Sequence, residues 1–258
     1  MQKKAIAGNL DTGLLKIIAF VLMVIDHVGA SIYPSVGELR ILGRIAFPLY
    51  IWCMAVGASY THDPVKYALR LLLVGLISQP CYMLGLNHTW SQWSVFFTLF
   101  LGYMGILGIQ QKRYGSQYWA PLLALALPCF INMDYGWRGV LLVMLMYLAR
   151  QNRGAILAMM VAFCLYWGTA YAPVTQVFGI KLAGNFFNLE IVKAFMRLQT
   201  LAILALPLIL WQKKTRTPLP KWLGYAAYPG HLILLWGVQL LMGRVTLQAS
   251  LSRLFPWM

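Results

Sequence analysis

An aspartate and a histidine stand side by side inside the first long apolar stretch of the 258-residue chain. Asp26 and His27 follow nine apolar residues, 17–25, without a break. An ionisable side chain inside a membrane helix costs at least a few kcal/mol unless it is paired or hydrated. Histidine exchanges protons near neutral pH, and a carboxylate can hold its tautomer and stabilise the imidazolium. The pair therefore indicates a site for general acid–base chemistry, with His27 as the base.

Two arginines follow at a spacing that lets them act together. Arg40 and Arg44 stand four residues apart, just before Phe47-Pro48. If the segment is helical, both share one face and form a strong site for an anion, which can be a phosphate, a carboxylate or Asp26. Successive residues of a helix point about 100° apart, so Asp26 can orient Arg44 instead of His27.

A lysine at the start of the same stretch extends this pattern. Lys16 precedes His27 by 11 residues, which places them within about 20° of one helix face and roughly 16 Å apart along the axis. A basic entry, a buried histidine and an arginine pair suit an enzyme that moves a group from a phosphorylated carrier.

Four more polar residues interrupt later apolar stretches. Arg70 lies in the third, Asp134 precedes the sixth, and Tyr228 and His231 lie in the last. Asp134 is an alternative partner for His27. Between Tyr228 and His231, Pro229-Gly230 is expected to open the helix near mid-depth.

The composition sets the environment of these residues. Of all residues, 60% are apolar and 10% are charged, against roughly 25% charged in an average soluble domain. The net charge of +15 comes mostly from basic residues between the apolar stretches, which membrane topology explains without a nucleic-acid partner. The four cysteines have no close pair, so neither a disulfide framework nor a metal site is expected.

The apolar stretches predict an all-α, polytopic membrane bundle of about nine (8–10) transmembrane helices in a single domain, residues 1–258. The segment 172–197 is mixed in character and is expected to be a surface or re-entrant segment. The predicted spans lie near residues 13–33, 44–60, 67–86, 94–110, 118–131, 138–149, 154–171, 198–212 and 222–242.

The distribution of basic residues predicts the orientation. Most of the 21 Lys and Arg residues, Lys3, Lys4 and Lys214 among them, fall on the side of the N-terminus. Because cytoplasmic loops carry an excess of Lys and Arg, the N-terminus is expected in the cytoplasm and the C-terminus outside.

At these residues the chain resembles the TraX family, membrane proteins that include the acetylases of F-type conjugative pilin. Each block is weak alone, but the blocks occur in order along nearly the whole chain. They are Leu15-Lys16-Ile17-Ile18-Ala19 with Asp26-His27-Val28-Gly29, Gly43-Arg44-Ile45-Ala46-Phe47-Pro48-Leu49, Tyr67-Ala68-Leu69-Arg70-Leu71 with Ile77-Ser78-Gln79-Pro80, Phe97-Thr98-Leu99, Asp134-Tyr135-Gly136, and Tyr228-Pro229-Gly230-His231-Leu232.

The resemblance implies a function and a location. It implies a multi-pass protein of the bacterial inner membrane that transfers acetyl from acetyl-coenzyme A to the N-terminal amine of mature pilin during pilus biogenesis. It assigns catalysis to His27, with Asp26, Arg44 and His231 in support. Coenzyme A is then expected to enter near Lys16 and Arg70.

Three alternatives remain open at the level of sequence. A related membrane enzyme can place acetyl on a hydroxyl of a glycan or another envelope acceptor. A proton-coupled or anion transporter can use Asp26 and His27 as a relay and Arg40 and Arg44 as a selector. A non-catalytic assembly protein leaves these buried polar residues unexplained.

Overall fold

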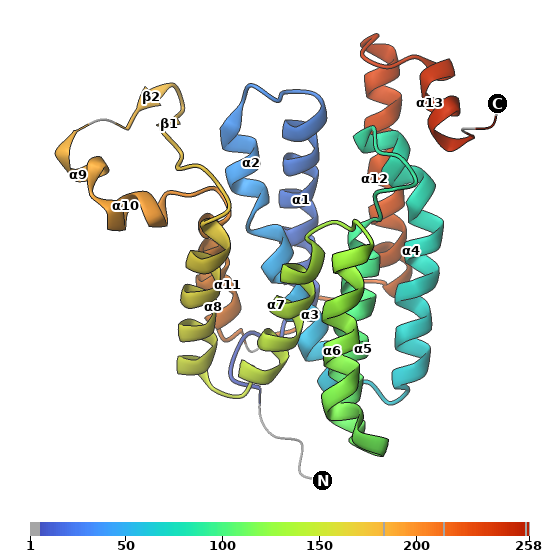
Figure 1. Ribbon diagram of the computed structural model, residues 1–258, viewed down its shortest axis with the longest axis vertical. Coiled ribbons are helices and arrows are strands. Elements are labelled where there is room, and N and C mark those ends of the chain that lie inside the picture. Colours follow the sequence, from blue (N-terminus) through green and yellow to red (C-terminus); the bar gives the residue numbers. More distant parts are fainter. Residues whose placement is uncertain (1–5, 183, 214, 256, 258) are drawn as a thin grey trace. The chain divides into compact units, whose positions relative to one another are not determined.

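The protein is mostly helical (Figure 1). A computed structural model describes residues 6–182, 184–213, 215–255 and 257, so Lys3, Lys4 and Lys214 lie outside the described residues. The chain forms two compact units. The first unit comprises Met1–Cys53 and Leu148–Pro218, and the second comprises Met54–Tyr147 and Leu219–Met258.

Apolar helices long enough to cross a membrane dominate the N-terminal part of the chain. Three helical stretches have the required length and composition: α1 (Thr12–Ser31), the pair α2–α3 (Gly37–Tyr60), and α4 (Pro64–Leu86). Shorter apolar helices follow at Val95–Gln111, Gly136–Ala149, Arg153–Gly168 and Thr200–Leu210. The protein is therefore built as a helical membrane protein.

The second predicted span begins earlier than expected and contains a break. It consists of α2 (Gly37–Gly43) and α3 (Ala46–Tyr60) rather than one helix from residue 44. Pro48 lies in the first turn of α3 and has no N–H to donate to the carbonyl of Arg44. Instead, the N–H groups of Arg44 and Ile45 bond three residues back, to Ile41 and Leu42, and close α2 with a tight turn. The break places Arg44 at a helix end.

The segment before α1 is bound into the interior of the first unit. The backbone N–H of Asn9 donates to the carbonyl of Ile209 (2.7 Å), and its side chain donates to Leu208 (3.0 Å). The indole N–H of Trp52 donates to the carbonyl of Asn9 at 2.7 Å. Residues 6–11 thus connect α1 with the segment near residue 209, far along the chain.

The eighth predicted span is shorter than expected but runs the length of its neighbour. It consists of the 3₁₀ helix η2 (Thr200–Ala205) and α11 (Leu206–Leu210), beside α8 (Arg153–Gly168). Gly168 packs directly on Thr200, and Arg153 donates to the carbonyl of Leu210 at 3.0 Å. A 3₁₀ helix rises about 2.0 Å per residue instead of about 1.5 Å. The six 3₁₀ residues lengthen this stretch by about 3 Å, and the long side chain of Arg153 bridges the remaining distance to Leu210.

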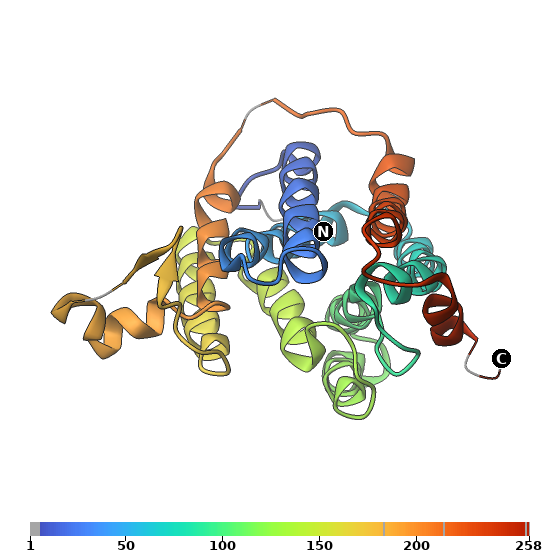
Figure 2. The same cartoon turned by 90° about the horizontal axis from the view of Figure 1, so that it is seen from above.

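Between α8 and η2 lies a separate segment within residues 172–197, described at residues 172–182 and 184–197, which we call the lateral segment. It contains a two-stranded antiparallel hairpin, β1 (Gln176–Val177) and β2 (Ile180–Lys181), and two short helices, α9 (Asn185–Asn188) and α10 (Glu190–Phe195). Figures 1 and 2 both show it extending sideways from the end of α8. None of its described elements is long enough to cross a membrane, in keeping with a surface position.

The second unit is a set of packed helices with a short helix at the C-terminus. Helix α4 packs against both α5 and α12, and α5 packs against α6. The short amphipathic helix α13 was not predicted from the sequence. The bounds are α5 (Val95–Gln111), η1 (Arg113–Gly115), α6 (Ser116–Phe130), α7 (Gly136–Ala149), α12 (Lys221–Leu241) and α13 (Leu247–Leu254).

One expectation about the second unit is wrong. Pro229 and Gly230 do not open the last long helix, because α12 continues through both residues. A proline removes only its own N–H from the helix ladder. Near it, His231 Nδ1 lies 3.0 Å from the carbonyl oxygen of Ala227 and can donate to it in the Nδ1–H tautomer.

Asp11 fixes the start of α1 and is fully buried. It accepts hydrogen bonds from the backbone N–H of Leu14 (3.1 Å) and of Thr217 (2.9 Å), and it pairs with Lys213 at 3.0 Å. Burial on its own would raise the pKa of the Asp11 carboxyl. The hydrogen bonds from Leu14, Thr217 and Lys213 outweigh it and hold that pKa well below its ordinary value of 3.8.

We expect Asp11→Ala to lower the free energy of unfolding by at least about 2 kcal/mol at neutral pH, because it removes charge-assisted hydrogen bonds from buried donors. Since the folded pKa is lowered, the stabilisation is complete above pH 3.8 and declines as the pH falls further. Thermal unfolding of the purified protein over a pH series measures both effects. Asp63→Ala is the matched control, since Asp63 caps α4 and pairs with Lys66 on the surface. An equal loss in both variants would contradict this role for Asp11.

Candidate functional site

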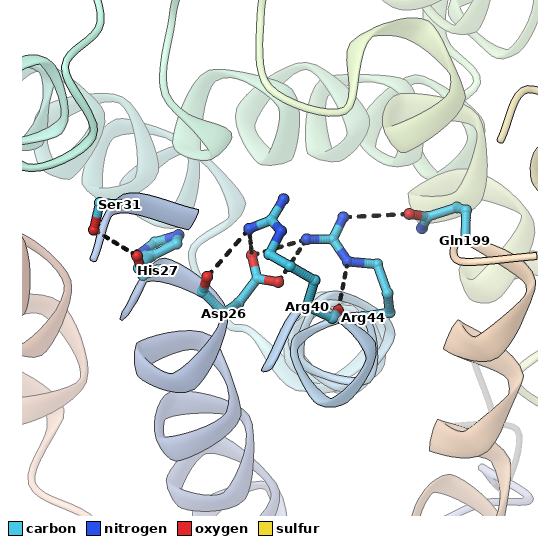
Figure 3. Close-up of polar contacts among 6 residues, drawn as sticks. All are labelled: Asp26, His27, Ser31, Arg40, Arg44 and Gln199. Atoms are coloured by element: carbon cyan, nitrogen blue, oxygen red, sulfur yellow. Dashed lines mark hydrogen bonds and ion pairs between the residues drawn. The ribbon is translucent and has the colours of Figure 1, made fainter. Parts of the chain in front are cut away.

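Asp26 is the centre of a buried ion-pair cluster in the first unit (Figure 3). Its Oδ2 lies 2.7 Å from Nη1 of Arg40, and its Oδ1 lies 2.6 Å from Nη2 of Arg44. Arg44 Nη2 also donates to Oδ2 at 2.8 Å. The expected contact between Asp26 and Arg44 is therefore present, and both carboxylate oxygens accept hydrogen bonds from guanidinium groups.

The helices position the two arginines for this contact. Arg40 and Arg44 lie one turn apart, and the Nε of Arg44 donates to the carbonyl of Arg40 at 3.2 Å. Arg40 Nη1 also donates to the backbone carbonyl of Asp26 at 3.2 Å. Side-chain exposure is 32% for Arg40, 7% for Arg44 and 8% for Asp26. Arg44 is thus the buried arginine, while Arg40 reaches the surface.

A glycine makes the close approach between α1 and α2 possible. A Cβ at Gly43 would lie 2.1 Å from Oδ1 and 2.2 Å from Cβ of Asp26. The Cβ of Asp26 is fixed by the backbone of α1, so it cannot rotate away. Gly43 is therefore the residue that lets the Asp26 side chain lie against α2.

This contact predicts a large effect for a single methyl group. We expect Gly43→Ala to lower the free energy of unfolding by about 1–3 kcal/mol through overpacking. Gly37 lies on the same helix, and a Cβ there meets nothing within 4 Å. Thermal unfolding of Gly37→Ala should therefore match the wild type, and equal melting temperatures for both variants would refute the steric role of Gly43.

The structure adds a residue that the sequence did not identify. The buried side-chain oxygen of Gln199 accepts a hydrogen bond from Nη1 of Arg44 at 3.4 Å. Gln199 is polar and stands at the start of the eighth apolar stretch, which is the one signal the sequence offers. It joins the segment before η2 to the ion-pair cluster.

His27 lies beside the cluster on α1 and is half-buried. Its backbone carbonyl accepts from the Ser31 hydroxyl at 2.7 Å. Figure 3 shows the Asp26 side chain directed at the arginines and His27 next to it on the helix. The site therefore combines an imidazole with two guanidinium groups and a single carboxylate, which leaves one excess positive charge.

Lys16 lies on the same helix but is not part of this cluster. It is exposed near the start of α1, and ten residues of helix separate it from Asp26, which is about 15 Å. Helix α1 is continuous from Thr12 to Ser31, so Lys16 and His27 keep the shared face that the sequence predicted.

The remaining predicted residues belong to the second unit. Arg70 donates from Nε to the carbonyl of Lys66 at 3.1 Å. The rings of Tyr228 and His231 lie 5.4 Å apart at 70°, and both side chains are buried. The structure thus places these residues on α4 and α12 of the second unit.

Asp134 lies in a turn that joins two of the family-like sequence blocks. Its backbone N–H donates to the carbonyl of Trp93 at 2.9 Å, and its carbonyl accepts from the Thr98 hydroxyl. Tyr135 and Gly136 follow with positive φ angles of 63° and 51°. A left-handed conformation is readily adopted by glycine, which explains the glycine of this block.

Comparisons with known proteins agree with the resemblance seen in the sequence. The family model described as "TraX protein" matches residues 11–239. An uncharacterized protein of Rickettsia prowazekii (strain Madrid E) is 26% identical over 145 residues, which are 54% of this chain and 56% of that protein. A probable fimbrial assembly protein, FimC of serogroup H1, from Dichelobacter nodosus is 37% identical over 73 residues, 26% of this chain and 30% of that protein.

The matched regions are only part of these relatives. The chain spans about half the length of the Rickettsia protein and under a third of the Dichelobacter protein. No solved structure matches the chain. The family model, in contrast, covers most of the chain, including Asp26, His27, Arg40, Arg44 and His231, and the protein therefore belongs to the TraX family.

Proposed function

We propose that this protein is a membrane acetyltransferase that transfers acetyl from acetyl-coenzyme A to the N-terminal amine of mature pilin. The observation that carries the proposal is the buried Asp26–Arg40–Arg44 cluster beside His27, in a chain that belongs to the TraX family. The relative named as a probable fimbrial assembly protein supports an acceptor connected with pili.

The proposed reaction is an acyl transfer from sulfur to nitrogen. The acceptor amine attacks the thioester carbonyl carbon, a C–N bond forms, and the C–S bond breaks. His27 takes the proton that the amine loses and returns it to the departing thiolate of coenzyme A. Because both oxygens of Asp26 already accept hydrogen bonds from arginines, Asp26 acts here as a positioning residue.

The charge of the cluster supports binding of an anionic substrate. Two permanently charged guanidinium groups face one carboxylate, so an anion can be bound without removing the ion pair. Arg40 is the accessible member, while Arg44 is held by Asp26 and Gln199. In this proposal Arg40 contacts the anionic donor, whose phosphates are the chemical group that suits a guanidinium.

We expect Arg40→Ala to raise the KM for acetyl-coenzyme A about tenfold or more and to leave kcat less affected, because the loss is in binding. Steady-state kinetics with each substrate varied in turn measure this separation. Arg113→Ala removes an exposed arginine from the short helix η1 and should leave both constants unchanged. A raised KM for pilin alone would assign the arginine to the acceptor.

The proposed topology has about nine spans, with the N-terminus in the cytoplasm and the chain in the bacterial inner membrane. The described apolar helices and the end-to-end packing of residues 200–210 on α8 support it. Asp26 lies five residues before the end of α1, about 8 Å along the axis, so the cluster falls in the outer half of the membrane.

Mass spectrometry of a co-expressed pilin tests the proposed acceptor. An N-terminal peptide heavier by one acetyl group, in cells with the wild-type protein only, is the expected result. Unmodified pilin together with acetylated envelope glycan would contradict the pilin assignment and favour a glycan hydroxyl. Uptake of an anion into proteoliposomes without acetyl-coenzyme A would favour a transporter.

A further inference from the structure

The lateral segment, residues 172–197, exposes many large apolar side chains although it lies outside the long helices. They are distributed over the hairpin and both short helices and do not form one helix face. Large apolar side chains exposed together in one short segment indicate a site of contact with a membrane or a protein. The exposed members are Phe178 (79%), Ile180 (69%), Phe186 (64%), Leu189 (52%) and Ile191 (68%).

The position of the lateral segment points to a particular depth in the membrane. It leaves α8 directly after Tyr166 and Tyr171, both exposed, and tyrosines at a helix end are typical of the boundary between lipid and water. The lateral segment then extends sideways from this end of the helix (Figures 1 and 2).

The charges of the lateral segment fit a surface of anionic phosphates. It carries three basic residues, Lys181, Lys193 and Arg197, against one acidic residue, Glu190, which pairs with Lys193 at 2.9 Å. Basic side chains near the headgroups of anionic lipids add electrostatic attraction to the burial of apolar side chains.

The lateral segment is also tied to the rest of the first unit. The N–H of Val174 donates to the carbonyl of Met196 at 2.8 Å and closes its neck. The backbone N–H of Phe178, at the tip of the hairpin, donates to the carboxylate of Glu38 in α2. These contacts close the neck of the lateral segment and join its hairpin to α2.

We propose that residues 172–197 lie in the interfacial layer of the bilayer as a lipid-binding platform. Phe186, Leu189 and Ile191 enter the boundary between headgroups and acyl chains, while Lys181 and Lys193 contact lipid phosphates. This inference concerns the membrane and is independent of the acetyl-transfer reaction.

Spin labels on neighbouring residues of α10 provide a matched test. Ile191 is exposed and apolar, and the side chain of Glu190, the residue before it, is 85% exposed and polar. Each variant, Ile191→Cys or Glu190→Cys, is made in a protein in which the accessible cysteines Cys81 and Cys129 have been replaced. The new cysteine is then spin-labelled, and the protein is placed in nanodiscs that contain phosphatidylglycerol. Power saturation then compares access to oxygen, which concentrates in lipid, with access to a water-soluble nickel complex.

We expect the Ile191 label to favour oxygen over nickel several-fold and the Glu190 label to favour nickel. Phe186→Cys serves as a second lipid-facing position if Ile191→Cys does not fold. Replacing both Lys181 and Lys193 with Glu should reduce the oxygen preference at residue 191 in anionic nanodiscs. Equal nickel access at residues 186, 190 and 191 would overturn the proposal. If the labels at residues 186 and 191 lose access to the nickel complex only after pilin is added, the proposal is overturned and the segment binds a protein partner instead.

Discussion

Replacing His27 with alanine should abolish acetyl transfer and leave a folded membrane protein. The imidazole is the proposed proton acceptor, and loss of general base catalysis lowers a rate by about 100-fold to 10,000-fold. The half-buried position of His27 predicts only a small effect on folding. Transfer of labelled acetyl from acetyl-coenzyme A to pilin, measured with protein in nanodiscs, gives the rate, and gel filtration gives the folded fraction.

His62 provides the matched control for this variant. It lies exposed in the turn between α3 and α4, so His62→Ala removes an imidazole without touching the site and should retain the wild-type rate. His27→Ala with the wild-type rate would remove His27 from the mechanism.

Replacing Asp26 with asparagine should lower the free energy of unfolding more than Asp11→Ala or Gly43→Ala does. The variant leaves Arg44 buried and without its carboxylate, and removal of one member of a buried ion pair costs about 3–5 kcal/mol. Acetyl transfer should fall with it, because Arg40 and Arg44 lose the group that orients them. Thermal unfolding and the transfer assay measure the two effects on the same sample.

A double variant separates the stability of the cluster from its chemistry. Asp26→Asn combined with Arg44→Gln removes both charges of the buried pair, so part of the stability should return while transfer stays low. Glu190→Gln, which breaks an exposed pair with Lys193, should change neither quantity. Full recovery of transfer in the double variant would show that the arginine has no role in the reaction.

The central contact of the site could be predicted because it depends on local geometry. Helical periodicity places Asp26 and His27 on different faces, and the spacing of Arg40 and Arg44 places both arginines on one face. An unpaired carboxylate in an apolar helix needs a cation, and two stand nearby in the sequence. The contact of Asp26 with Arg44 follows from these two facts.

Other features depend on contacts between distant parts of the chain and could not be predicted. Gln199 reaches Arg44 only because residues 200–210 pack along α8. The need for glycine at position 43 follows from the distance between α1 and α2, which hydrophobic patterning does not encode. The start of α3 was a missed local signal, since Pro48 belongs in the first turn of a helix.

The lengths of the helices show where hydrophobic patterning reaches its limit. Each predicted span corresponds to a helix or a pair of helices, but the sequence could not show that η2 is a 3₁₀ helix. The lateral segment was expected at a surface because of its mixed composition. The hairpin within it depends on left-handed φ angles of 49° at Phe178 and 74° at Gly179, and only the glycine signals such a turn.

The most direct measurement of the proposed activity uses the full-length protein in nanodiscs with acetyl-coenzyme A and mature pilin. We expect N-terminally acetylated pilin and free coenzyme A thiol to appear in equal amounts with the wild-type protein, and neither product to appear with His27→Ala. Intact-mass spectrometry and a thiol assay follow the two products. Wild-type protein that is folded and binds both substrates but forms no acetylated pilin would contradict the proposed activity.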